Sequence, residues 1–111
     1  MQLESVGDVI ATRILHLDGA DGSPRTLTVR IGRPQCFPDP PDDYFVPYQI
    51  VGMGDERVGH VAGIDAVQAL QLVMGVIGAE LTALSQESAG AISWEAGQQE
   101  HDLGFPEYSP Q

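Results

Sequence analysis

The stretch from Asp65 to Gln86 constrains the fold more than any other, because it has the pattern of one long apolar helix. Large apolar side chains recur there at alternating spacings of three and four, which places them on one stripe of a helix. We expect this stripe to face the core, and its residues are Val67, Leu70, Met74, Ile77, Leu81 and Leu84, with Ala69, Val73 and Val76 widening it on one side. Asp65 is a typical N-cap, and Gln68 follows it at the spacing of a capping box.

The opposite edge of this helix is small and polar, and it consists of Gln71, Gly75, Gly78 and Thr82. Gly inside a helix costs about 1 kcal/mol relative to Ala, so a close packing contact is expected there. Either this edge is buried under the sheet or under the C-terminal segment through Phe105, or it is a candidate interaction surface for a homodimer. A membrane span is disfavoured, because the uncharged run is shorter than the roughly 20 residues that a bilayer requires.

Four extended runs precede the helix. Residues 9–17 and 26–33 flank a turn-forming cluster, DGADGSP, and the second run alternates apolar and polar side chains as a strand does. Residues 44–51 and 57–64 flank the glycine-rich GMGDE and predict a second hairpin, in which Tyr48 lies opposite His60. The proline-rich segment 34–43 between the hairpins predicts a rigid exposed loop without strand structure.

These elements predict an α+β fold. We expect an antiparallel four-stranded meander, or a five-stranded one if residues 92–95 add a short strand, with one long helix packed across one face. Residues 1–106 are expected to form a single domain, in which Leu103 and Phe105 tuck against the core. Residues 107–111 are expected to form a mobile C-terminal tail.

The charge balance excludes some partners and favours others. The net charge is −11, and from residue 58 onward the chain has seven acidic residues and no Arg or Lys. Nucleic-acid binding is disfavoured, because it requires a basic patch. Solubility explains most acidic surfaces, and the alternative is an acidic face for a basic protein partner. The N-terminus lacks the basic and apolar regions of a signal peptide, so we expect a cytoplasmic protein.

No residue pattern predicts a catalytic, cofactor or metal site. The single cysteine, Cys36, excludes a disulfide within the chain, and the histidines have no metal-ligand spacing. The expected pair of His60 and Tyr48 is the one polar site on an apolar face. A hydrogen-bonded core histidine explains this pair, and the alternative is a general base.

Most of the chain resembles a known family. The resemblance is carried by the stretch DDYFVPYQIVGMGDERVGHVAGIDAVQALQLVMGVIGAEL and by LGFP near the end. Its motifs are a Tyr-x-x-Pro-Tyr strand, a Gly-Asp turn and a Gly-x-Asp-Ala-x-Gln-Ala-Leu helix start. It is similar to a family of small bacterial proteins with a domain of unknown function, over about residues 25–106. These motifs are structural, so the resemblance implies a fold and no catalytic residue.

The sequence therefore predicts a non-enzymatic, acidic protein-interaction module of the adaptor or immunity type. One alternative is a secretion-type chaperone, which is also small, acidic and dimeric but would need a second helix. A further alternative is a small hydrolase or isomerase that uses His60 or His16 with a nearby acid.

Overall fold

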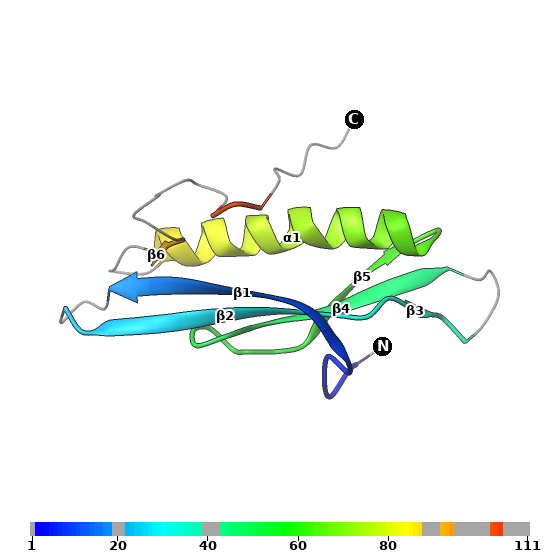
Figure 1. Cartoon of the computed structure of the whole chain (residues 1–111), viewed down its shortest axis with the longest axis horizontal. Helices are drawn as coiled ribbons and strands as arrows, with labels where there is room; N and C mark the ends of the chain where they lie inside the picture. The colour runs from blue at the N-terminus through cyan, green and yellow to red at the C-terminus, as the bar shows by residue number, and fades with distance from the viewer. Residues whose placement is uncertain (1, 19–21, 39–42, 88–91, 95–102, 106–111) are drawn as a thin grey trace.

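The computed structural model describes residues 2–18, 22–38, 43–87, 92–94 and 103–105. Within these ranges, an antiparallel sheet carries one helix, α1 (Ala66–Glu87), along one face (Figure 1). The strands are β1 (Val9–Asp18), β2 (Pro24–Gly32), β3 (Gln35–Cys36), β4 (Tyr44–Val51), β5 (Gly59–Gly63) and β6 (Ile92–Ser93). The predicted α+β meander with one long helix is confirmed. The expected tail 107–111 lies outside the described residues.

The four longer strands follow one another across the sheet in chain order, β1, β2, β4 and β5. β6 extends the sheet beyond β1, where His16 pairs with Ser93, so the fifth strand forms over two residues. The prediction of a strand-free proline-rich segment is wrong at β3, where Gln35 pairs with Phe45 on β4. This pairing is compatible with the prolines, because neither residue of β3 is itself a proline and both keep their backbone donors.

The register of the second hairpin differs by one residue from the prediction. His60 lies opposite Pro47, and Tyr48 lies opposite Gly59. A Cβ atom at Gly59 would approach the ring of Tyr48 to 2.7 Å, so a larger residue opposite this ring would require the ring to move. The shift moves His60 to the other face of the sheet, because side chains alternate along a strand. There its ring meets Phe45 edge-on, at 6.0 Å between centroids.

The core lies between the sheet and α1. The predicted inner face of the first hairpin is confirmed, because all five of its residues are buried: Leu15, Leu17, Leu27, Val29 and Ile31. Val46, Tyr48 and Ile50 continue this face on β4. Leu103 and Phe105 are also buried in this core, as expected for the C-terminal segment.

The buried stripe of α1 keeps Ile77 and Leu81 from the predicted stripe, and it is rotated toward the side that Ala69 and Val73 were expected to widen. The fully buried side chains are Ala69, Val73, Ile77 and Leu81, whereas Val67 is 64% exposed. Leu70, Met74 and Leu84 are partly buried at the border of the core. The rotation follows from the close approach of α1 to β5, since a Cβ atom at Gly63 would lie 2.5 Å from the backbone nitrogen of Ala69. The small residue Ala69 therefore lets α1 pack closely against β5 at Gly63.

The predicted start of the helix is confirmed. The Asp65 carboxylate accepts a hydrogen bond from the backbone N–H of Gln68 at 2.7 Å. The Gln68 side chain accepts one in return from the N–H of Ile64 at 2.8 Å. The first bond satisfies a backbone donor of the first helical turn, and the second ties the residue before the cap to the same turn.

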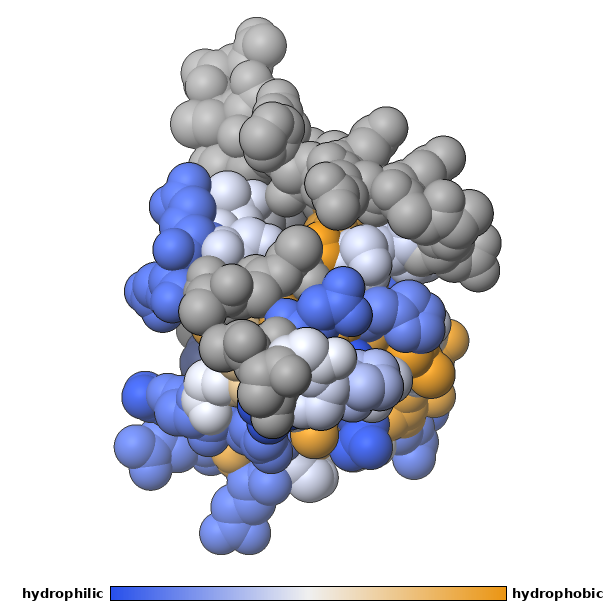
Figure 2. Space-filling view, turned by 90° about the vertical axis from the view of Figure 1, so that its left-hand side faces the viewer, coloured by the Kyte–Doolittle hydropathy of each residue, from blue (hydrophilic) through white to orange (hydrophobic). Residues whose placement is uncertain are grey.

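The exterior is uneven in polarity. Figure 2 shows hydrophilic surface over much of one end of the molecule and apolar surface gathered on one flank. The exposed large apolar side chains of the described residues are Val9, Ile10, Ile14, Ile64 and Val67. By length and hydropathy alone α1 could cross a membrane, but the core helix of a soluble protein meets the same criteria. Here the side chains on one side of α1 pack against the sheet.

Candidate acidic groove

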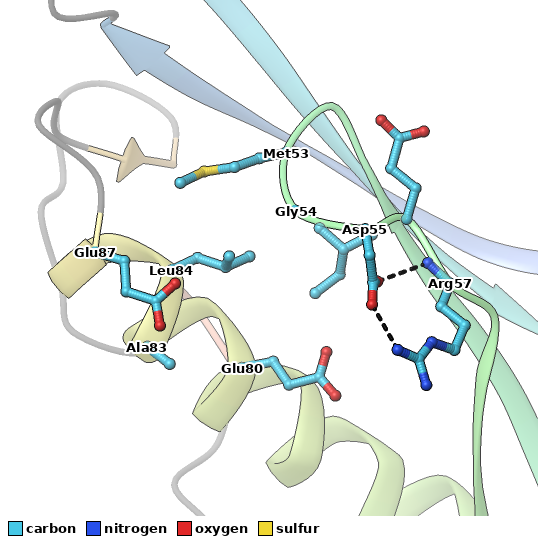
Figure 3. Close-up of a pocket in the computed structure, with 10 residues that line it drawn as sticks. Met53, Gly54, Asp55, Arg57, Glu80, Ala83, Leu84 and Glu87 are labelled. Carbon is cyan, nitrogen blue, oxygen red and sulfur yellow. Dashed lines mark hydrogen bonds and ion pairs between the residues drawn. The ribbon is translucent and has the colours of Figure 1, made fainter.

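A groove of about 280 Å³ separates the C-terminal half of α1 from the loop between β4 and β5. We call it the acidic groove, and Figure 3 shows its lining side chains. The apolar part of the lining comes from Ile50, Met53, Ala83 and Leu84, and the acidic part from Asp55, Glu56, Glu80 and Glu87. Arg57 is the single basic residue of the lining.

The helical wall is built from one face of α1. Glu80, Leu84 and Glu87 follow one another at spacings of four and three, so their side chains leave the helix on the same side. Figure 3 shows Glu80 and Leu84 extending from the helix toward the loop that carries Asp55. The two carboxylates therefore flank an apolar side chain at the wall of the groove.

The opposite wall is a tightly bonded loop. Gly52 has a φ of 116°, and a Cβ atom there would lie 2.5 Å from the carbonyl oxygen of Thr26, so this position requires glycine. The Glu56 carboxylate accepts a hydrogen bond from the N–H of Gly52 at 3.2 Å. The Glu56 carbonyl accepts one from the side chain of Gln49 at 2.8 Å. These bonds hold Glu56 in a left-handed conformation, with a φ of 56°.

Asp55 and Arg57 form an ion pair on this loop, with 2.8 Å between the carboxylate and the guanidinium. The backbone N–H of Arg57 donates a further bond to Asp55 at 3.0 Å. These bonds lower the pKa of Asp55, the backbone bond most and the side-chain bond next. The ion pair neutralises Asp55, so the other acidic residues give the groove a net negative charge. Within the described ranges, neither Glu80 nor Glu87 forms an ion pair.

Tyr48 links the acidic groove to the core. Its hydroxyl donates a hydrogen bond to the carboxylate of Glu80, while its ring is buried under α1. Burial raises the pKa of Tyr48, and the bond to Glu80 and the negative charge of this carboxylate raise it further. The phenol therefore stays protonated and remains a donor that orients Glu80.

Four of the site residues proposed from the sequence lie on α1, and they differ in exposure. Gly75 and Gly78 are buried, Gln71 is exposed, and the Thr82 hydroxyl donates to the carbonyl of Gly78 at 2.9 Å. His16 is exposed on β1.

Tyr48 and His60 lie on different faces of the sheet, yet both line a second hollow of about 620 Å³ near Glu4 and Arg57. The described residues contain no group of three or more His, Cys, Asp or Glu side chains that could hold a metal ion.

The acidic groove could not be predicted from the sequence pattern. Its two walls come from segments about 25 residues apart in the chain, and only the tertiary fold brings them together. The available signal was the spacing of Glu80 and Glu87 around Leu84, on a helix without basic residues.

The chain belongs to the family described as a domain of unknown function, DUF6968, which matches residues 11–107. The resemblance drawn from the strand, turn and helix motifs is thereby confirmed at the level of an uncharacterised family. The match also includes most of β1, which that resemblance left out. No curated protein and no solved structure matches the chain.

Proposed function

We propose that this member of the DUF6968 family is a non-enzymatic interaction protein whose acidic groove binds a basic segment of a partner protein. The observation that carries the proposal is the arrangement of Glu80 and Glu87 on either side of Leu84, in a groove whose opposite wall carries Asp55. The only Arg of the lining is already paired with Asp55. Two carboxylates are therefore available to a cation from outside.

The chemistry of the lining suits Lys or Arg side chains of the partner. Such a side chain combines an apolar stem with a charged end. The stem can lie on Met53 and Leu84, while the charged end meets Glu80 and Glu87. Tyr48 supports this arrangement, because its hydrogen bond limits the rotation of the Glu80 carboxylate before a partner arrives.

The overall charge favours the same class of partner. A net charge of −11 attracts basic proteins over long range and speeds their association, and dissolved salt screens the attraction. We therefore expect binding that weakens as the salt concentration rises.

The experiment measures the binding of Lys- and Arg-rich peptides, with acidic peptides of equal length for comparison. The double variant Glu80→Gln/Glu87→Gln should weaken basic-peptide binding at least about tenfold, since two charge-assisted contacts are lost. The matched control, Asp8→Asn/Asp18→Asn, removes the same charge from exposed positions outside the groove. Equal weakening in both double variants would show that binding depends on net charge alone and would refute the groove.

The homodimer and the cytoplasmic location remain predictions. Gly75 and Gly78 are buried within the single chain. Of the proposed dimer surface, a second copy could therefore contact the exposed Gln71 and the half-buried Thr82. The chaperone alternative is less favoured, because the described ranges contain one helix.

A further inference from the structure

A third hollow, on the flank of β1, has a chemistry opposite to that of the acidic groove. It measures about 320 Å³ and lies between the sheet, α1 and the C-terminal segment. Most of its walls are apolar, and the residues that matter here are Ala11, Arg13, Val29, Ile31, Met74 and Phe105. We call it the β1 pocket. Its size reaches the lower end of the range of small-molecule sites.

Arg13 is the only charged residue in the walls of the β1 pocket. It lies on the inner face of β1, in the same register as the buried Leu15 and Leu17. A cation at such a position loses hydration and normally finds a carboxylate. The chain has 16 acidic residues, yet no ion pair of Arg13 occurs within the described residues.

The contacts of Arg13 fix its guanidinium without neutralising it. The group lies 3.9 Å from the ring centroid of Trp94 and 4.8 Å from that of Phe105. One of its N–H groups donates to the carbonyl oxygen of Leu103 at 3.3 Å. Aromatic contacts use the faces of the guanidinium, whereas carboxylates bind its N–H groups in the plane. The N–H groups in the plane of the Arg13 guanidinium are thus held beside the apolar walls of the β1 pocket.

From this juxtaposition we propose that the β1 pocket binds a small amphipathic carboxylate, with the carboxylate on Arg13 and an aliphatic chain between Ile31 and Met74. The charge of Arg13 selects the anionic end, and the apolar walls select the chain. Neither end alone suffices, because a short carboxylate leaves the walls unfilled and an uncharged chain gives the guanidinium of Arg13 no carboxylate.

Trp94 provides the reporter, since it is the only tryptophan of the chain and contacts the guanidinium of Arg13. The probe is octanoate, titrated into the full chain below its micelle concentration, with acetate and octanol as comparisons. We expect a saturable change in Trp94 fluorescence with octanoate, and at least tenfold weaker responses to acetate and octanol. Calorimetric titration provides a second readout that does not depend on tryptophan.

Two variants test the position of the ligand. Ala11→Phe places a ring in the pocket from an exposed strand position, and Arg13→Gln removes the charge. Each should weaken octanoate binding at least tenfold, whereas Ile14→Thr, an exposed residue of the same strand outside the pocket lining, should leave it unchanged. Absence of saturable binding, equal binding of octanol, or unchanged binding by a folded Ala11→Phe or Arg13→Gln variant would overturn the proposal.

Discussion

The hydroxyl of Tyr48 on β4 donates a hydrogen bond to the carboxylate of Glu80 on α1, and this bond joins the core to the acidic groove. The two residues lie 32 positions apart in the chain. The sequence pattern predicts His60 opposite Tyr48, whereas the structure places Gly59 there. The bond makes Tyr48 a residue through which the stability of the fold and the geometry of the groove can be tested together.

We predict that Tyr48→Phe lowers the free energy of unfolding by about 0.5–1.5 kcal/mol, the net value of a typical hydrogen bond. The ring and its packing remain, so the loss reports the bond to Glu80. Urea denaturation followed by circular dichroism measures the change. Tyr44→Phe is the control, because Tyr44 faces the same side of β4 and no hydrogen bond of its hydroxyl is found among the described residues. An equal loss in both variants would contradict the assignment.

The raised pKa of Tyr48 predicts a loss of stability in alkali. An unfolded tyrosine releases its proton near pH 10, while the folded chain retains the proton of Tyr48 to higher pH. The stabilising contribution is therefore complete below about pH 10 and decreases as the pH rises toward the folded-state pKa. Denaturation curves between about pH 8 and 11 should show a steeper decline for the wild type than for Tyr48→Phe. Parallel declines would contradict the prediction.

Gly63 controls the distance between β5 and α1. In Gly63→Ala the new Cβ would lie 2.5 Å from the nitrogen and 2.9 Å from the Cα of Ala69, and backbone atoms cannot rotate away. The helix start would have to move, and we expect a loss of about 1–3 kcal/mol, as for other overpacked sites. Thermal denaturation measures it. The control is Ala62→Val, since Ala62 is the exposed neighbour on the same strand and should tolerate the larger side chain.

Gly78→Arg distinguishes an internal packing position from a surface for a second copy. Gly78 is buried in the single chain, so the guanidinium should destabilise the domain and lower its melting temperature. Gln71→Arg adds the same charge at an exposed position of the same edge and should leave the fold intact. Light scattering then reads the oligomeric state. A wild-type chain that is monomeric at high micromolar concentration would refute the homodimer, and a Gln71→Arg monomer formed from a wild-type dimer would support it.

Short-range signals in the sequence determined the elements. Alternation in residues 26–33 identified β2, and Asp65 with Gln68 identified the first turn of α1. These signals depend on neighbours within one turn or one strand, so they can be read without the rest of the chain. The inner face of the first hairpin followed from the same alternation, because each strand can bury only one set of side chains against the helix.

Only the tertiary structure decided how the elements meet. The rotation of α1 depends on how closely Ala69 can approach Gly63, and the register of β5 depends on the room that Gly59 leaves for the ring of Tyr48. The acidic groove arises where the helix wall of Glu80 and Glu87 lies across from the loop of Asp55, and the β1 pocket arises where Arg13 meets Trp94 and Phe105. Each is a contact between distant segments, whose distance is set by the packing of the whole core rather than by local preference.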